Sequence, residues 1–213
     1  MHYREGLAVA SNDVPGTAGA DYAERLQRLE TARWKQVLNV QAPYRWNLRR
    51  LELGRTLDVG CGIGRNLSHL ADGKNPAPVG VDHNATSIEI ARQRGFTAYT
   101  VDEFHESADA KPDSFDAILA SHLVEHLLEP DAKAVVESYL PYLRSGGRIV
   151  FITPQEKGYT TDATHIRFSG FDEVSALAQD VGLSVLKTYS FPFPRFAGKF
   201  FAYNEFVVVA RKP

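Results

Sequence analysis

The chain has very little cysteine, little net charge and no long run of apolar residues. Among its 213 residues, Cys61 is the single cysteine, so no internal disulfide is possible and a cytoplasmic location is expected. The formal net charge of −2 disfavours a dedicated nucleic-acid-binding protein. No apolar run approaches the roughly 20 residues of a membrane helix, so no membrane insertion is expected. The composition indicates nothing about the oligomeric state.

From residue 55 onward, short apolar segments alternate with amphipathic ones. The expected strands cover residues 56–59, 78–81, 97–101, 115–120, 148–153, 184–189 and 205–210. The expected helices cover residues 66–70, 86–94, 131–144 and 172–181. Strands that alternate with helices of this length form a parallel sheet covered on both faces. The sequence therefore predicts a doubly wound α/β domain over residues 55–213.

Residues 1–54 have a different pattern and are expected to form an N-terminal arm and helical annex. One helix is expected over roughly 22–38, and a second from Pro43 to near Gly54. We expect this annex to cover the ligand-binding edge of the sheet and to form one wall of a substrate site.

A glycine-rich turn follows the first expected strand. Gly60, Gly62 and Gly64 are separated by single residues, and Asp58 precedes them. Glycines let a backbone turn tightly and let a ligand approach the main chain. Dinucleotide-binding turns instead have the spacing G-x-G-x-x-G, and an acidic residue disfavours a nearby pyrophosphate. The pattern thus departs from the dinucleotide-binding one.

Acidic residues also follow the next two expected strands. Asp82 lies where an acid can accept hydrogen bonds from both hydroxyls of a ribose. Asp102 and Glu103 lie where a carboxylate could hold an adenine amino group. Each acid alone could equally be a helix N-cap or a turn residue. Together they fall at the carboxyl edge of a parallel sheet, where such folds bind ligands.

Residues 55–213 resemble the class I S-adenosylmethionine-dependent methyltransferases. LDVGCGIGRN (57–66) is similar to their first motif, VGVDHN (79–84) to their ribose-binding motif, and SFDAILASHLVEHL (114–127) and LRSGGRIVFITP (143–154) to two later ones. The resemblance implies a mostly parallel seven-stranded sheet with an antiparallel last strand, and S-adenosylmethionine as cofactor. The cofactor-binding residues that it implies are Asp58, Gly60, Gly62, Gly64, Asp82, His83, Asp102, Glu103 and Ser121.

His122, Glu125 and His126 form an H-x-x-E-H string, which also occurs in one class of zinc protease. That class needs the string within a helix, whereas here it follows the fourth expected strand, so a protease is disfavoured. Two interpretations without a metal stay open. The Glu-His pair is common in class I methyltransferases, and the histidines could be polar residues that pack beside the cofactor.

A narrower resemblance implies a metal site instead. O-methyltransferases of ubiquinone synthesis and of small-RNA 3′ ends carry E-x-x-E-H here and bind a divalent cation with it. By that resemblance, the expected ligands are His122, Glu125, His126 and His165. Such a set suits Mn, Fe, Zn or Ni better than Mg, and a bound cation lowers the pKa of a substrate hydroxyl. Without a metal, His126 or His165 is the best general base, and His122 is the third catalytic candidate.

The substrate side is less determined by the sequence. Arg167 either pairs with an acid, which orders its loop, or binds an anionic substrate group. The aromatic residues between Tyr189 and Tyr203 either pack against the core or line an apolar substrate pocket. We expect an O-methyltransferase for a small-molecule substrate, assisted by a divalent cation. The alternatives are a methyltransferase for RNA 3′ ends and a non-catalytic, cofactor-binding regulator.

Overall fold

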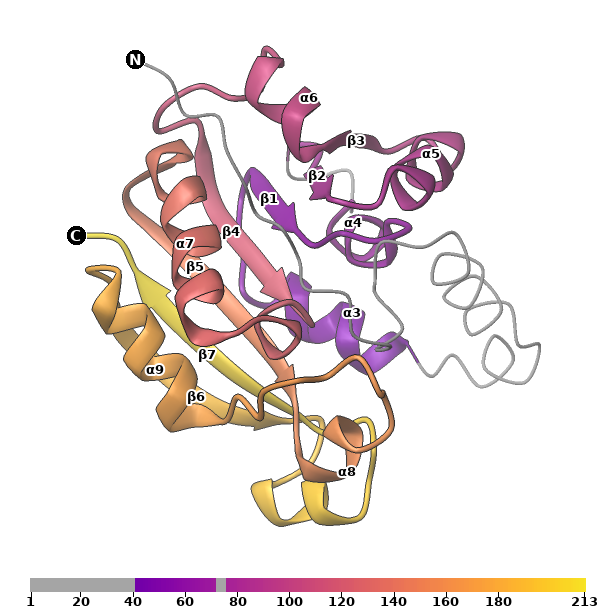
Figure 1. Cartoon of the computed structure of the whole chain (residues 1–213), viewed down its shortest axis with the longest axis vertical. Helices are drawn as coiled ribbons and strands as arrows, with labels where there is room; N and C mark the ends of the chain where they lie inside the picture. Colours follow the sequence, from indigo (N-terminus) through magenta and orange to yellow (C-terminus); the bar gives the residue numbers. More distant parts are fainter. Residues whose placement is uncertain (1–40, 72–75) are drawn as a thin grey trace.

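A seven-stranded sheet forms the centre of the protein (Figure 1). The computed structural model describes residues 41–71 and 76–213. The strands are β1 (Thr56–Val59), β2 (Val79–Asp82), β3 (Thr97–Thr100), β4 (Phe115–Ser121), β5 (Leu143–Pro154), β6 (Ser184–Phe191) and β7 (Glu205–Arg211). Their order in the sheet is β3-β2-β1-β4-β5-β7-β6. Strand β7 runs antiparallel to the other six. The predicted seven-stranded sheet with an antiparallel last strand is confirmed.

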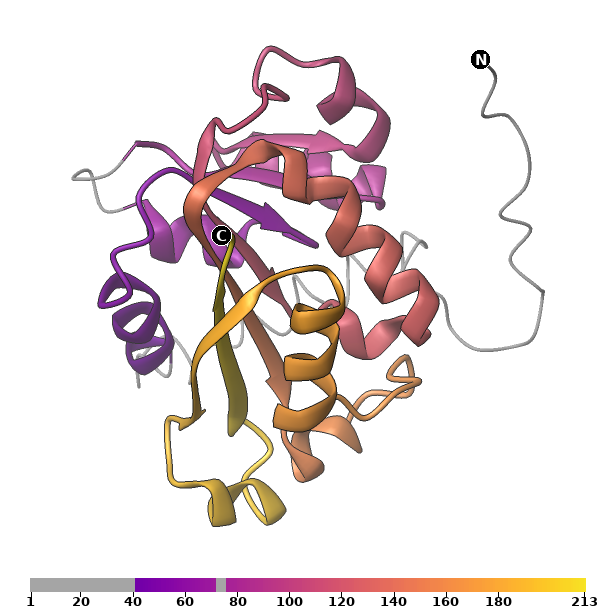
Figure 2. The ribbon, with the colours of Figure 1, turned by 90° about the vertical axis from the view of Figure 1, so that its left-hand side faces the viewer.

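Helices cover both faces of this sheet (Figure 2). The helices are α3 (Ala42–Arg49), α4 (Arg65–Leu70), α5 (Ala85–Gln93), α6 (Val101–Glu106), α7 (Glu129–Tyr139), α8 (Glu156–Tyr159) and α9 (Phe171–Asp180). The 3-10 turns are η1 (Val124–His126), η2 (Leu140–Tyr142) and η3 (Arg195–Lys199). One face of the sheet packs against α6, α7 and α9, and the other against α3, α4 and α5.

The central strands are apolar on both faces. In β4, Ile118 and Ala120 join the core beneath α7 and α9, whereas Ala117 and Leu119 join the core beneath α3. Neighbouring β5 repeats this alternation. Successive side chains of a strand point to opposite faces, so a strand covered on both faces is a continuous apolar run. The predicted doubly wound α/β architecture is confirmed.

Three boundaries differ from the sequence prediction. The helix expected over 131–144 ends at Tyr139 and a 3-10 turn follows, because Pro141 has no N–H for the helical bond. Strand β5, expected over 148–153, already includes residues 145–147, where the N–H of Gly146 donates to the carbonyl of Lys212 at 3.0 Å. The third strand ends at Thr100, and the unexpected helix α6 follows it directly.

The N-terminal annex is described only in part. The expected arm and the helix over 22–38 lie outside the described residues. The second expected helix is present as α3 and begins beside Pro43, but it ends at Arg49 rather than near Gly54. The segment packs on the sheet through three buried leucines: Leu48, Leu51 and Leu53. No helix in the described part of the chain is long and apolar enough to cross a membrane.

Candidate cofactor and acceptor site

The glycine-rich turn joins β1 to α4 at the carboxyl edge of the sheet. Gly60, Gly62 and Gly64 have φ angles of 79°, 52° and 86°, a conformation that glycine adopts without steric cost. The backbone N–H groups of Gly60 and Cys61 both donate to the carbonyl of Val81, at 2.8 and 3.1 Å. The turn is therefore fixed to β2, and a Cβ at Gly64 would come within 2.7 Å of the ring of Phe96.

Asp58 lies at the base of this turn with an unsatisfied carboxylate. Its side chain is fully buried, and neither carboxylate oxygen has a hydrogen-bond partner among the described residues. Burial, reinforced by the charge of Asp82, raises the pKa of Asp58 to about 7, and the nearby Arg65 and Asn66 offset this only in part. A buried carboxylate without partners is costly. The position therefore suits a ligand group that is cationic or donates hydrogen bonds.

Asp82 connects the glycine-rich turn to the end of β2. Its Oδ2 accepts the N–H of Gly62 at 2.8 Å, and its Oδ1 accepts the N–H of Asn84 at 2.8 Å. His83 is half exposed, with its Nδ1 3.4 Å from Oδ1 of Asp82. The structure thus brings Asp82 and the glycines together, as expected for residues that share one ligand.

Asp102 and Glu103 occupy the first turn of α6 rather than a strand end. The side-chain oxygen Oε2 of Glu103 accepts the N–H of Thr100 at 2.8 Å and a hydrogen bond from Arg92 at 2.6 Å. The bond from Thr100, followed by that from Arg92, lowers the pKa of Glu103. Glu103 therefore caps its own helix, which was the alternative reading of this acid. Its contact with an adenine stays a prediction.

The H-x-x-E-H string does not form a helix. Strand β4 ends at Ser121, and His122 has a positive φ of 55° and donates its N–H to the carbonyl of Ile152 at 2.8 Å. Only residues 124–126 form a single 3-10 turn. His122 is therefore not on one helical face with Glu125 and His126, and this segment lacks the helix that a zinc protease of this class needs.

His122 is held between two carboxylates. Its Nδ1 lies 3.2 Å from Oε1 of Glu125, and its Nε2 lies 3.0 Å from Oε1 of Glu205. Burial opposes a charge on the ring, but the hydrogen bonds and charges of Glu125 and Glu205 outweigh it and raise the pKa of His122 to about 9. A protonated imidazole with both nitrogens occupied has no lone pair for a metal or a proton. In this arrangement both nitrogens of His122 already contact carboxylates, and its role as a metal ligand or as a base stays a prediction.

Three of the four expected metal ligands do converge. Glu125, His126 and His165 each offer one ligand atom, and these atoms lie within 4.8 Å of one another. Nδ1 of His126 lies 3.0 Å from the carbonyl of Thr164, and Nδ1 of His165 lies 2.8 Å from that of Tyr159. Because a carbonyl only accepts, each Nδ1 carries a proton, so Nε2 is the nitrogen of each ring that a metal ion could bind.

The carboxylate of this cluster has one oxygen to spare. Glu125 is fully buried, and while Oε1 contacts His122, Oε2 has no hydrogen-bond partner in the described chain. The backbone carbonyl of Glu125 accepts the N–H groups of Ile166 and Arg167, at 3.0 and 3.1 Å. These bonds hold the loop of His165 against the turn of His126. Burial also lowers the pKa of His126, which keeps its ring neutral.

Comparison with known protein families identifies the family of this chain. Residues 22–188 match the family model described as a methyltransferase domain. The chain belongs to the class I S-adenosylmethionine-dependent methyltransferases. The resemblance of the four sequence motifs is therefore confirmed, and S-adenosylmethionine is the cofactor of the family.

Relatives of this methyltransferase include oxygen-methylating enzymes. The chain is 34% identical over 104 residues to a ubiquinone biosynthesis O-methyltransferase of Idiomarina loihiensis, covering 46% of the chain and 42% of that relative. It is 30% identical over 136 residues to the 27-O-demethylrifamycin SV methyltransferase of Amycolatopsis mediterranei, covering 59% and 49%. The chain thus spans less than half the length of these relatives.

The fold is also that of solved methyltransferases. The magnesium protoporphyrin IX methyltransferase of Synechocystis, solved with bound SAH, superimposes with a TM-score of 0.64 at 15% sequence identity. The match covers 92% of this chain and 97% of that one. At this identity the likeness concerns the fold alone.

One feature of the methyltransferase site was not predicted. Glu205, the second partner of His122, begins β7 opposite the end of β5. An acid at the start of an otherwise apolar strand was the available signal. Arg167 contacts Glu129 at 3.3 Å, so of the two alternatives for this arginine the structure shows the pairing with an acid.

Proposed function

We propose that the protein transfers a methyl group from S-adenosylmethionine to an oxygen of a small molecule, assisted by a divalent cation at Glu125, His126 and His165. The observation that carries the proposal is the buried, unpartnered Oε2 of Glu125 beside two imidazoles whose Nδ1 atoms are already bonded. A carboxylate oxygen and two unprotonated nitrogens form a donor set that needs a cation or a proton to be satisfied.

The cofactor side of the proposal rests on Asp58 and Asp82. S-adenosylmethionine supplies an electrophilic methyl group on its sulfonium, and it also carries an ammonium, a ribose and an adenine. The unpartnered carboxylate of Asp58 suits the ammonium, and Asp82 suits the ribose hydroxyls. The positive-φ glycines let the methionine part approach the main chain. Ser121 and His83 complete the expected cofactor contacts, with Asp102 and Glu103 at the adenine end.

The donor set favours particular cations. Two imidazoles and one carboxylate suit Mn, Fe, Zn or Ni better than Mg, which prefers oxygen ligands. Ligand atoms around one such ion, at about 2.1 Å from it, are separated by roughly 3.5 Å. The three ligand atoms lie within 4.8 Å of one another. Side-chain movements of about 1 Å would bring them to the spacing that one ion needs.

The acceptor is proposed to be a small hydroxylated molecule. A cation, when bound, lowers the pKa of a coordinated hydroxyl. The relatives named for ubiquinone biosynthesis and for 27-O-demethylrifamycin SV support oxygen as the methylated atom. If no cation binds, the neutral ring of His126 can accept the hydroxyl proton through its free Nε2. The two versions differ in their response to a chelator.

The test combines binding and turnover. Calorimetry with S-adenosylmethionine and its demethylated product measures cofactor binding, and a labelled methyl donor with a panel of hydroxylated small molecules measures transfer. Failure of both cofactor forms to bind would refute the enzyme proposal. Label recovered in an amine or a carbon–methyl product would refute O-methylation.

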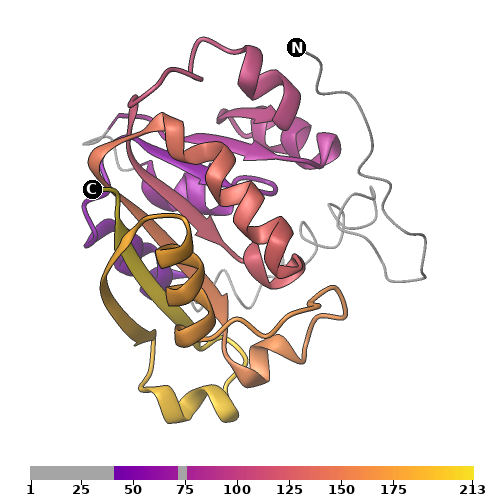
Figure 3. The ribbon, with the colours of Figure 1, turned by 60° about the vertical axis from the view of Figure 1, so that its left-hand side comes forward.

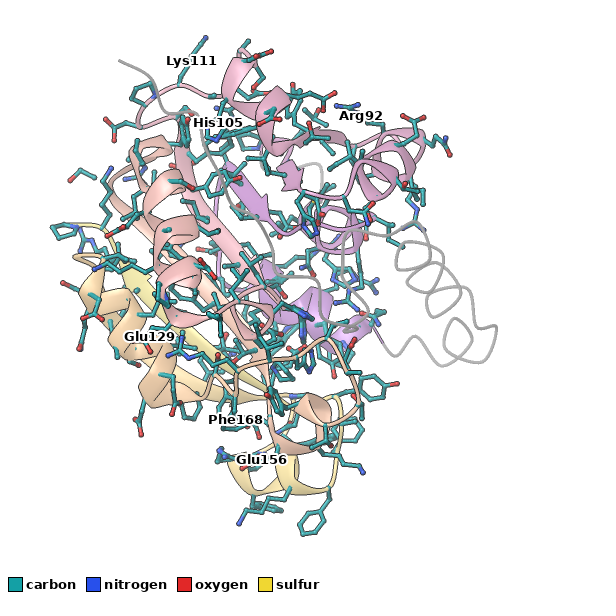
Figure 4. All side chains as sticks on the ribbon, viewed as in Figure 1. Arg92, His105, Lys111, Glu129, Glu156 and Phe168 are labelled. Carbon is teal, nitrogen blue, oxygen red and sulfur yellow. The ribbon has the colours of Figure 1, made fainter. Side chains whose placement is uncertain are left out.

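The cation is tested by elemental analysis of the purified protein. We expect about one equivalent of Mn, Fe, Zn or Ni, lost in His126→Ala and His165→Ala, with transfer reduced at least about 100-fold. His105→Ala is the matched control, because His105 lies on α6, at the opposite end of the molecule from Glu156 in Figure 4. Protein that is metal-free and fully active in a chelator would refute the cation. His126 would then remain as the proposed proton acceptor.

A further inference from the structure

The loop between β6 and β7 exposes a cluster of aromatic rings. It projects from the lower end of the molecule in Figures 1 and 3. Half of the exposed large apolar side chains of the described chain lie on it. We call this cluster the hairpin tip, and its members are Phe193 (50% exposed), Phe196 (69%), Phe200 (80%), Phe201 (37%) and Tyr203 (54%). Contiguous exposed apolar surface of this kind marks an interaction site.

The exposure is built into the fold. Asn204, at the base of the tip, is fully buried, and its Oδ1 accepts the N–H of Phe193 at 2.9 Å. Its Nδ2 donates to Oε1 of Gln155 and to Oγ of Ser190, both at 2.9 Å. Within the tip, a Cβ at Gly198 would come within 1.9 Å of that same Oε1. The rings are therefore presented by a tightly anchored loop.

The charged residues of the loop itself are all basic. From Leu186 to Asn204 the sequence has no acidic residue but contains Lys187, Arg195 and Lys199. Arg195 pairs with Glu156, which Figure 4 places just above the tip, and Lys157 follows that acid. Cations beside aromatic rings are the combination that binds the interface of a bilayer rich in anionic lipid.

We propose that the hairpin tip docks on an anionic lipid bilayer surface. Its aromatic rings enter the headgroup region, and Lys199 and the neighbouring cations contact the lipid phosphates. A second copy of the chain is a poorer partner. A symmetric contact would place the basic residues of two loops against each other, and the loop has no acidic residue to balance them. The docking requires neither the cation nor O-methylation.

Docking would also orient the molecule. Gly158 packs against the backbone of Ala202 in the tip, where a Cβ would come within 2.4 Å of its carbonyl. The next residue, Tyr159, accepts the hydrogen bond from His165. A surface bound at the tip thus lies beside the loop that carries His165, a consequence that rests on the proposed function of that residue.

The test is flotation of the full chain with lipid vesicles. Wild-type protein is expected to float with vesicles of phosphatidylcholine and phosphatidylglycerol, and much less with phosphatidylcholine alone. The double variant Phe196→Ser, Phe200→Ser should reduce the partition coefficient by about tenfold or more, and Lys199→Glu by about fivefold or more. Leu186→Ser is the matched control, because Leu186 is 52% exposed on β6 outside the tip.

Calorimetry with S-adenosylmethionine on each variant separates a lost surface from a lost fold, since none of these residues is assigned to the cofactor site. Wild-type protein that fails to float with anionic vesicles would overturn the proposal, as would tip variants that float like the wild type. Equal binding to neutral vesicles would overturn the anionic preference. A wild-type dimer that the double variant converts to a monomer, without vesicle binding, would assign the tip to a second copy.

Discussion

Asp58 and His122 lie at the carboxyl edge of one sheet, yet their charges are balanced in different ways. His122 is partly exposed, and its two nitrogens each contact a carboxylate, which favours the protonated ring. Asp58 is a buried acid with no hydrogen-bond partner in the described chain. The first charge is compensated by the protein itself, and the second only in part, by Arg65 and Asn66. A buried carboxylate that is only partly compensated lowers stability, so its presence in the glycine-rich turn is best explained by a ligand that satisfies it.

The variant Asp58→Asn tests this explanation. It keeps the shape of the side chain but removes the charge that would face the cofactor ammonium. We expect the dissociation constant for S-adenosylmethionine to rise by about 100-fold, as for the loss of a buried charge partner. Because folding raises the pKa of Asp58 to about 7, the ligand-free variant should be more stable than the wild type at pH 8, by up to about 4 kcal/mol.

The stability gain should depend on pH. Asp58 costs stability as pH rises from its unfolded pKa near 4 towards about 7, so the gain should be smaller at pH 5 than at pH 8. Calorimetric binding and urea unfolding at both pH values measure the two effects. Tighter or unchanged cofactor binding in Asp58→Asn would contradict the assigned role.

At the scale of elements, local signals determined most of the fold. Gly95 and Gly182 end helices α5 and α9 close to the predicted positions. The seven strands were found because each is a short apolar run between such stops. The errors have local and nonlocal causes. Thr100 and Glu103 form a capping box that starts α6 at a strand end, whereas Gly146 joins β5 through its bond to Lys212, far away in the chain.

The site was predictable where its residues share one motif or follow neighbouring parallel strands, as Asp82 does. Asp58 and the glycines lie in one turn, so their proximity follows from the sequence. The surroundings of His122 do not, because Glu205 is 83 residues away and contacts it only when β7 pairs with β5. A histidine between two carboxylates and a histidine beside a metal look the same in a sequence. The spacing of H-x-x-E-H therefore did not reveal that both nitrogens of His122 contact carboxylates.

The β6–β7 loop provides a prediction at the same scale. The variant Asn204→Ala removes the amide that holds the loop, and it leaves the buried side chain of Gln155 and the N–H of Phe193 without their partner. We expect a loss of about 2–4 kcal/mol in the free energy of unfolding, measured by urea denaturation. Hydrogen exchange at Phe193 should also become faster.

Gln93→Ala is the matched control for this loss. Gln93 is an exposed amide on α5, and its Nε2 donates to Oε1 of Glu89, one helical turn away, at 3.0 Å. Its replacement should change the free energy of unfolding by no more than about 0.5 kcal/mol. Equal effects of the two variants would show that the Asn204 network does not anchor the loop.

At the scale of the whole molecule, four titratable groups shift the pH dependence of stability in opposite directions. Burial, followed by nearby arginines, lowers the pKa of His69 to about 4, and burial lowers that of His126. These two groups make the folded state more stable as pH rises to about 6.5, the unfolded value for histidine. Asp58 acts against them over about pH 4 to 7. His122, with a pKa raised to about 9, contributes stability that is fully present below about 6.5.

The free energy of unfolding of the ligand-free protein should therefore be highest near pH 6.5 and fall as pH rises to 9. Above pH 7 the loss comes mainly from His122, which gives up its proton and its two ion pairs, and it should amount to about 2–3 kcal/mol. Urea denaturation at pH 6.5, 8 and 9 measures it. Glu205→Gln removes one of the two carboxylates that hold the proton, so its curve should be lower at pH 6.5 and flatter above it. A wild-type stability that is constant from pH 6.5 to 9 would mean that His122 is neutral, and its ring would then be available to a metal ion after all.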